Sequence, residues 1–403
     1  MQWKAPVLFL CLAAAALVLL ARRSPGEEGV EVTYMPMQPV TIMVATDPHF
    51  LAPSLTDGGA AFQQVITHAD GKEMQRISEI VDALFDRAAS ERPAALILSG
   101  DLTFNGERES HEAFAAKCAA LEEKGIDVLV LPGNHDLNRS DAARFEGDAV
   151  VPVGSVSAAD FREIYAPFGY DEAWSADDHS LSYVYRLCDG LRILFVDCNA
   201  DAGNDTIPSE SFPWIESQLQ DAQAAGERVI AVSHQTVLQH NSRFADGFVI
   251  TNCDRLLRLF RQYHVAVNLS GHMHIQHVRQ EGRFTEIVTG ALSVLDCPCG
   301  VLRLTGEGGE YTARSAVSAE LQAEATAFFR ANAFHQGMAG GDEEMAGYLA
   351  DLNAAYFSGR MDLAERNAAL LRRWREADAF TVSYIESLLE DLGRDFTKAS
   401  FSF

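Results

Sequence analysis

The chain has few basic residues for its length. Among 403 residues, Lys and Arg total 32 against 57 Asp and Glu, which gives a formal net charge of -25 at pH 7. Proteins that bind long nucleic acids neutralise the phosphates with Lys and Arg. The shortage of cations therefore argues against a long nucleic acid as partner. A small phosphate-bearing substrate would need a bound metal cation to offset its charge.

Cysteine is also scarce, and the seven cysteines are scattered along the chain. An odd number of cysteines without regular spacing excludes a disulfide framework or a zinc-finger pattern. The step Cys297-Pro298-Cys299 could hold a metal ion, although two separate thiols are the more common outcome for such a pair. Hydrophobic residues make up 48% of the chain and charged residues 22%, which predicts packed cores rather than disorder.

One long uncharged run lies near the start of the sequence, at residues 5–20, with Lys4 before it and Arg22 and Arg23 after it. Its length is just sufficient to span a bilayer. We therefore predict a signal or membrane anchor at 1–23 and a linker at 24–39. No small-residue cleavage site follows, which favours an anchored chain with an extracytoplasmic catalytic domain over secretion after signal cleavage.

From residue 40 to about 306, short apolar runs alternate with segments of helical periodicity. Apolar runs of strand length occur at 40–45, 94–99, 127–131, 192–196, 228–233, 265–270 and 284–288. Helical spacing of apolar residues occurs at 74–85, 114–121, 214–219 and 256–263. This alternation predicts an α/β domain with buried strands at 40–306. The strand pattern stops there, so we predict a helical C-terminal extension at 307–403.

Polar motifs directly follow five of the predicted strands. They are Asp47-Pro48-His49, Gly100-Asp101, Gly133-Asn134-His135-Asp136, His234 and Gly271-His272-Met273-His274. A single such motif is usually a turn or a cap, but five at strand ends are improbable as accidents. Because the carboxyl ends of strands in open α/β sheets converge on one crevice, these side chains are expected to share a site. Carboxylates, imidazoles and an Asn carbonyl suit Mn²⁺, Fe²⁺ or Zn²⁺.

This set of motifs resembles the signature of the calcineurin-like metallophosphoesterases, and its Gly-Asn-His-Asp and Gly-His-x-His forms are most similar to the class III cyclic-nucleotide phosphodiesterases. The resemblance covers roughly residues 40–300. It implies a four-layer α/β/β/α sandwich that holds two divalent metal ions, Mn, Fe or Zn. It further implies that Asp47, His49 and His274 hold one ion, that Asn134, His234 and His272 hold the other, and that Asp101 bridges both.

Two departures narrow the resemblance. The Asp-Arg-Gly sequence of protein Ser/Thr phosphatases is missing after Asp101, and with it a phosphate-binding Arg. Purple acid phosphatases carry a metal-binding Tyr where this chain has Phe104. A tyrosinate-coloured ferric site is therefore not expected.

The resemblance also implies a mechanism, in which two neighbouring cations activate a water for in-line attack on phosphorus. His135, next to the expected ligand Asn134, is the predicted general acid for the leaving group. We expect Asp136 to orient or charge His135, with a turn-closing hydrogen bond as the alternative.

Substrate selection is expected to lie in the insert at 50–72 and in the stretch 235–252. Four further side chains could contact substrate: His68, Arg139, His240 and His277. An exposed loop histidine is the more common outcome for a residue such as His68, and a surface ion pair for one such as Arg139. We expect hydrolysis of small phosphodiesters or phosphomonoesters, with a nucleotide or a lipid head group as substrate. The alternative function is a catalytically silent, membrane-tethered scaffold or binding module. That alternative would be marked by a missing ligand, and all seven expected ligands are present.

Overall fold

The computed structural model describes residues 33–68, 71–200, 205–338 and 342–403. The predicted anchor at 1–23 lies outside the described residues, as does the predicted linker up to residue 32. Within the described ranges, no helix combines the length and the apolar character that a bilayer crossing requires. Residues Tyr34–Phe403 form one compact unit.

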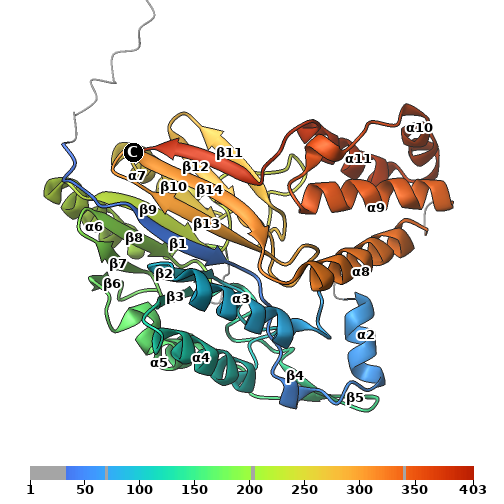
Figure 1. Ribbon diagram of the computed structural model, residues 1–403, viewed down its shortest axis with the longest axis horizontal. Helices are drawn as coiled ribbons and strands as arrows, with labels where there is room; N and C mark the ends of the chain where they lie inside the picture. Colours follow the sequence, from blue (N-terminus) through green and yellow to red (C-terminus); the bar gives the residue numbers. More distant parts are fainter. Residues whose placement is uncertain (1–32, 69–70, 201–204, 339–341) are drawn as a thin grey trace, which may run out of the picture. The chain divides into compact units, whose positions relative to one another are not determined.

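Two large mixed β-sheets form the centre of this unit (Figure 1). The first has the strand order β15 (Lys398–Ser402), β14 (Gly308–Ser315), β13 (Pro298–Leu304), β1 (Val40–Ala45), β2 (Ala95–Ser99), β3 (Asp127–Leu131). The second has the order β11 (His277–Glu281), β12 (Phe284–Val288), β10 (Val267–Ser270), β9 (Arg228–Ser233), β8 (Leu191–Val196), β7 (Tyr183–Cys188), β6 (Ser175–Ala176). The strands that precede the five motifs pair in parallel with their neighbours, β1 with β2, β2 with β3, and β9 with β10.

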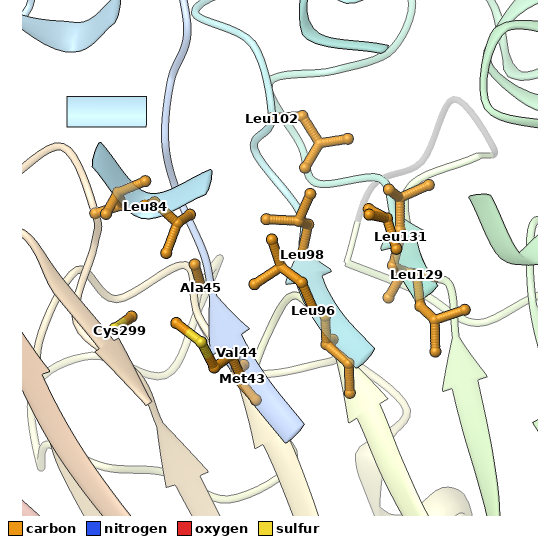
Figure 2. Packing of buried hydrophobic residues seen from close by; sticks show 14 of the residues in the cluster. Met43, Val44, Ala45, Leu84, Leu96, Leu98, Leu102, Leu129, Leu131 and Cys299 are labelled. Carbon is orange, nitrogen blue, oxygen red and sulfur yellow. The ribbon is translucent and has the colours of Figure 1, made fainter. Parts of the chain in front are cut away.

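The two sheets share one hydrophobic core, because residues of β1, β2 and β3 belong to the same buried cluster as residues of β7, β8, β9 and β10. The Tyr183 hydroxyl joins the sheets directly by donating to the Val130 carbonyl oxygen at 2.9 Å. Figure 2 shows the first sheet from close by, with Leu96 and Leu98 of β2 beside Leu129 and Leu131 of β3. Such runs are apolar at every position because both faces of the sheet are covered.

Helices cover the outer face of each sheet. The first sheet carries α3 (Ile77–Glu91) and α4 (Arg108–Glu122), and the second carries α6 (Ser211–Ala225) and α7 (Cys253–Gln262). This order of helices, sheet, sheet and helices is a mixed α/β sandwich. Smaller elements are α2 (Ala60–His68), α5 (Ala158–Ile164) and a hairpin of β4 (Ala143–Glu146) and β5 (Ala149–Pro152).

The expectation that residues after 306 are purely helical is wrong. β14 and β15 lie in this region and complete the first sheet through antiparallel pairs with β13 and with each other. Both strands were missed because their residues alternate between buried and exposed positions, so that neither forms a continuous apolar run. The rest of the region forms α8 (Ala319–Gly337), α9 (Glu343–Phe357), α10 (Ala368–Ala377) and α11 (Ala379–Leu388).

The C-terminal helices gather at one end of the sheets (Figure 1). Their core contains Trp374 and Ile385 and also Met273 and Ile275, which flank His274 in the chain. The helices therefore pack directly on the segment that carries two of the expected metal ligands. The Cys297-Pro298-Cys299 step lies away from those ligands, because both thiols are free and buried in the core of the sandwich, where Figure 2 labels Cys299.

Candidate metal centre

Side chains from all five motifs come together at the carboxyl ends of the strands. Ligand atoms of one group lie within 4.8 Å of one another, and this group contains Asp47, His49, Asp101 and His274. Ligand atoms of a second group satisfy the same limit, and this group contains Asp101, His234 and His272. Asn134 adjoins the second group, with its Oδ1 3.2 Å from His234 Nε2. Asp101 is common to both groups, as a bridging ligand would be.

The ligand atoms lie close enough to one another to bind the same ion. His49 Nε2 lies 3.1 Å from His274 Nε2 and 3.7 Å from Asp101 Oδ2. His234 Nε2 lies 3.3 Å from the same Asp101 oxygen. The opposite nitrogen of His234, Nδ1, donates to the Ser99 carbonyl oxygen at 2.8 Å. This bond fixes the tautomer and directs Nε2 to the site, which is the usual role of the groups that surround a metal ligand.

The backbone at the site is unusual. Asp47, His49, Asp101, His272 and His274 all have positive φ angles, between 46° and 65°. They are five of the eleven non-glycine residues with positive φ among the described residues. Residues other than glycine adopt this conformation at a cost, and such strain is concentrated at functional sites. The local fold is therefore shaped to aim these five side chains inward.

Two glycines leave the space that the ligands occupy. A Cβ atom at Gly133 would collide with the Asp101 carboxylate and would lie 2.7 Å from His234 Nε2. A Cβ atom at Gly271 would collide with the Thr46 hydroxyl and would lie 2.6 Å from Asp47 Oδ2. Glycine at both positions is therefore a steric requirement of the site.

A cation fits the site because one oxygen of the buried Asp47 carboxylate has no hydrogen-bond donor among the described residues. Asp47 Oδ2 accepts hydrogen bonds from the Thr46 hydroxyl at 2.7 Å and the His272 backbone N–H at 3.0 Å. Its other oxygen, Oδ1, is buried and accepts no hydrogen bond from the described residues, although His274 Nε2 lies 3.3 Å away. A buried charged oxygen without a partner is unfavourable unless a cation binds it. Carboxylate, imidazole and amide donors together suit a divalent transition metal.

The electrostatics lead to the same conclusion. Burial raises the pKa of Asp101, but His234 and His135 outweigh burial and hold that pKa well below its usual range. Burial lowers the pKa of His234, but the Asp101 and Asp47 carboxylates raise it to about 10. The two carboxylates therefore stabilise a positive charge at the site. In the absence of a metal ion, a proton on His234 provides this charge.

His135 lies beside the expected ligand His49 at the candidate metal centre. Its Nδ1 lies 2.9 Å from the Phe104 carbonyl oxygen and 3.0 Å from Asn105 Oδ1, and its ring lies edge-on to His49 with centroids 4.9 Å apart. The ring also lines the cavity at the site. Burial lowers the pKa of His135, and the positive charge of Lys72 adds to this effect.

Asp136 does not orient His135. Its carboxylate is fully buried and accepts hydrogen bonds from the backbone of Leu102, Thr103 and Gly133 at 2.8–3.0 Å, and from the Thr103 hydroxyl at 2.9 Å. These bonds tie the loop after β2 to the loop after β3. The turn-closing alternative for Asp136 is therefore the one that the structure supports, because its hydrogen bonds do not reach the His135 side chain.

A cavity of about 530 Å³ opens at the candidate metal centre. Asp101, Asn134, His135, His272 and His274 are among its lining residues. The other lining residues come from α8, α9 and α11, together with Phe248, Met273, Gly71 and Lys72. The insert at 50–72 thus contributes through its last two residues, and the stretch 235–252 contributes Phe248.

The four side chains that could have contacted substrate do not line this cavity. His68 is exposed at the end of α2, and Arg139 pairs with Asp141 at 2.7 Å. His240 and His277 are buried elsewhere, with their Nδ1 atoms 2.8 Å apart. The residues that sequence reasoning missed are Lys72 and the cavity wall from the C-terminal helices. Lys72 could have been noticed as a cation within the insert, but no local pattern marks the wall.

The fold and the site define a class of protein, and comparison with known proteins gives the same class. A family model described as calcineurin-like phosphoesterase matches residues 40–276, more than half of the chain. The chain belongs to this family, which confirms the resemblance drawn from the motifs.

Individual relatives have low sequence identity to this chain and match about half of it. The chain is 27% identical over 190 residues to a glycerophosphodiester phosphodiesterase GpdQ from Enterobacter lignolyticus, which covers 46% of this chain and 57% of the relative. It is 27% identical over 201 residues to a probable cyclic nucleotide phosphodiesterase from Rhodococcus erythropolis, which covers 49% of this chain and 56% of the relative. The aligned part is thus little more than half the length of these relatives.

A solved structure gives a fold match. A dimetal phosphatase from Danio rerio has a TM-score of 0.50 and 13% identity, and the match covers 70% of this chain and 98% of that chain. This likeness supports the sandwich fold alone.

Proposed function

We propose that the chain is a metal-dependent phosphoesterase that hydrolyses phosphodiester or phosphomonoester bonds of small molecules. The observation that carries this proposal is the pair of ligand groups that share Asp101 at a cavity. Membership of the calcineurin-like phosphoesterase family supports it. So do the two relatives, whose names describe phosphodiesterases.

In this mechanism the seven expected ligands would hold two divalent cations, which would supply a nucleophile at neutral pH and neutralise phosphoryl charge. Asp47, His49 and His274 would serve one ion, Asn134, His234 and His272 the other, and Asp101 both. The carboxylates of Asp47 and Asp101 are preoriented by hydrogen bonds from the His272 and His135 backbone N–H groups, at 3.0 and 2.7 Å. Preorientation lowers the cost of ordering the ligands when the ions bind.

The proton for the leaving group would come from His135. Because Nδ1 faces the Phe104 carbonyl oxygen, Nε2 is the atom that can carry and release the transferred proton. Lys72 lines the same cavity and would place a positive charge near the phosphoryl oxygens. This Lys would take part of the role of the Arg that protein Ser/Thr phosphatases have in their motif.

A small substrate fits the charge of the chain. A net charge of -25 opposes binding of a long polyanion. A nucleotide or a lipid head group is small enough to enter a cavity of about 530 Å³. Whether a diester or a monoester is preferred depends on the cavity wall rather than on the ligands.

We also propose that residues 1–23 anchor the chain in a membrane, with the catalytic unit on the extracytoplasmic side. The uncharged run at 5–20 supports this proposal. Fractionation of cells that produce the full chain, followed by sequencing of its amino terminus, tests it. A soluble extracellular protein that starts after residue 23 would instead establish secretion.

The test of activity uses the full chain after chelation and after reloading with Mn²⁺, Zn²⁺ or Fe²⁺. Substrates are bis- and mono-p-nitrophenyl phosphate and a panel of cyclic nucleotides. We expect turnover that disappears on chelation and returns with at least one metal, and that Asp101→Asn abolishes. Asp141→Asn, an exposed carboxylate paired with Arg139, is the control and should retain activity.

Activity that survives complete metal removal would overturn the two-metal account. The scaffold alternative would be favoured by a chain that binds its metals but hydrolyses none of these substrates.

A further inference from the structure

The cavity at the candidate metal centre also has a wall with a different chemistry. This wall comes from three C-terminal helices, with Phe329 of α8, Phe357 of α9 and Phe380 and Tyr384 of α11 among the lining residues. The same helices contribute Asn332, Gln336 and Asn353. Among the described residues that line the cavity, those from α8, α9 and α11 carry no charge. The wall is therefore neutral although the chain has 57 acidic residues.

Aromatic rings connect this wall to the metal centre. The Phe248 ring lies 5.5 Å from the ring of His272, an expected ligand, and 5.1 Å from the ring of Phe244. The Phe244 ring in turn lies 6.1 Å from that of Tyr384. Phe248 and Tyr384 both line the cavity, so a group attached to a phosphate at the metals would meet these two rings as it extends toward α11.

One ring at the cavity is exposed. The side chain of Phe380 is 70% exposed, although it is large and apolar. The Arg243 guanidinium lies 4.9 Å from the centroid of the Phe380 ring, which holds the ring in position by a cation–π contact. An exposed ring that is held at a cavity gains stabilisation when a ligand covers it.

Hydrogen-bonding groups accompany the rings. The Tyr384 hydroxyl donates to Asn353 Oδ1 at 2.7 Å, and no described residue accepts a hydrogen bond from Asn353 Nδ2. Carboxamides can bond to the edge of a heteroaromatic ring, while aromatic side chains cover its face. A polyol would instead require many closely spaced polar groups. Aromatic rings can bind an organic cation, but the positive charge of Arg243 against Phe380 opposes a second cation there.

We infer that α8, α9 and α11 form a specificity subsite for the organic group of the phosphoester, and that the group it selects is an uncharged planar ring. Phe380 and Tyr384 are its specificity-determining residues. This inference rests on the proposed phosphoesterase function and names the class of substrate. The C-terminal helices thus act on substrate choice, while the ligands from the five motifs act on the phosphate.

The test compares three ligands on the metal-loaded full chain by isothermal titration calorimetry: phenylphosphonate, methylphosphonate and phosphocholine. The phenyl and methyl ligands have the same kind of phosphonate head and differ in the organic group. We expect phenylphosphonate to bind about tenfold more tightly than methylphosphonate, because stacking of one ring is worth about 1–3 kcal/mol.

Variants assign the preference to the wall. Phe380→Ala should reduce the phenyl-to-methyl ratio about three- to tenfold without changing the methylphosphonate Kd. Phe380→Leu, which keeps apolar bulk but removes the ring, should reduce the ratio as well. Leu363→Ala removes another exposed apolar side chain of the C-terminal region that does not line the cavity, and it should leave all Kd values unchanged.

Equal Kd values for the phenyl and methyl ligands would overturn the subsite while leaving the proposed phosphoesterase function intact. Tighter binding of phosphocholine than of phenylphosphonate, or a full phenyl preference in Phe380→Leu, would overturn the assignment to a planar ring. Failure of all three ligands to bind would count against the proposed phosphoester site itself.

Discussion

At the scale of single residues, the site is built from side chains whose positions violate ordinary preferences. Asp47, His49 and Asp101 have positive φ, and a carboxylate oxygen of Asp47 is buried without a hydrogen bond from the described residues. His135 differs from them, because it is not among the clustered ligand atoms and its Nδ1 faces a backbone carbonyl. Its role can therefore be separated experimentally from metal binding.

Replacing His135 by Ala should leave the metal content unchanged and lower turnover by about 10² to 10⁴ for poor leaving groups. Good leaving groups need no proton, so their hydrolysis should be affected far less. The measurement is kcat across a series of aryl esters of increasing leaving-group pKa, together with metal analysis of the purified variant. An equal loss across the series would contradict the acid role.

A second residue-scale prediction concerns Glu107, whose carboxylate is buried before α4. Burial raises the pKa of Glu107 to about 7. This pKa is above the value of 4.5 that the group has in the unfolded chain. Below pH 4.5 the carboxyl group is neutral in both states, so its burial does not lower the free energy of unfolding. The loss in the free energy of unfolding caused by burying this group grows between pH 4.5 and 7 and is constant above that range.

Glu107→Gln should therefore raise the free energy of unfolding by about 1–3 kcal/mol at pH 8 and by much less at pH 5. Urea denaturation of the metal-free chain at the two pH values measures this. Glu112→Gln changes an exposed carboxylate of the same helix and is the control. A gain of equal size at both pH values would refute the explanation by burial.

At the scale of elements, a buried chain of polar side chains attaches the C-terminal region to the sandwich. His277, at the start of β11, donates a hydrogen bond from Nε2 to Asp391 Oδ2 at 3.1 Å, and its Nδ1 lies 2.8 Å from His240 Nδ1. His240 in turn lies 3.3 Å from Glu286 of β12, and all four side chains are buried. Burial lowers the pKa of His277 to about 4, so that this imidazole is neutral at pH 7.

His277→Ala removes the side chain that connects His240 to Asp391, so that both residues lose their contact with His277. We expect a loss of about 1–3 kcal/mol in the free energy that protects α11 and the turn up to Asp391. Hydrogen exchange followed by mass spectrometry should locate faster exchange there, with unchanged exchange in α6. Uniformly faster exchange across both sheets would show that His277 stabilises the whole unit and not the C-terminal region in particular.

The elements also show what sequence could and could not predict. The strands at 40–45, 127–131 and 228–233 were predicted with the observed bounds, because strands buried on both faces are continuous apolar runs. β7 and β14 were missed, since Arg186 and Glu310 interrupt them on a polar face. The ligands were recognisable from local motifs, whereas the cavity wall depends on tertiary packing of helices that no motif connects to the site.

At the scale of the whole molecule, metal binding should stabilise the fold, because only the folded chain gathers the seven expected ligands. A ligand that binds the native state alone at 100 times its Kd adds about 2.7 kcal/mol. We expect Mn²⁺ or Zn²⁺ to raise the Tm of the chelated full chain by several degrees in differential scanning fluorimetry. Asp101→Asn should abolish most of this rise, and Asp141→Asn should preserve it.

The family match ends at residue 276, but the first sheet does not. β13, β14 and β15 are formed after that point, and β13 pairs with β1, the strand that leads into Asp47. A fragment cut at the family boundary would leave β1 as a bare edge, and unprotected edges of this kind recruit other chains into aggregates. Attempts to excise the catalytic unit should therefore retain residues through 402, and insolubility of a shorter piece would report on a missing edge rather than on a defective active site.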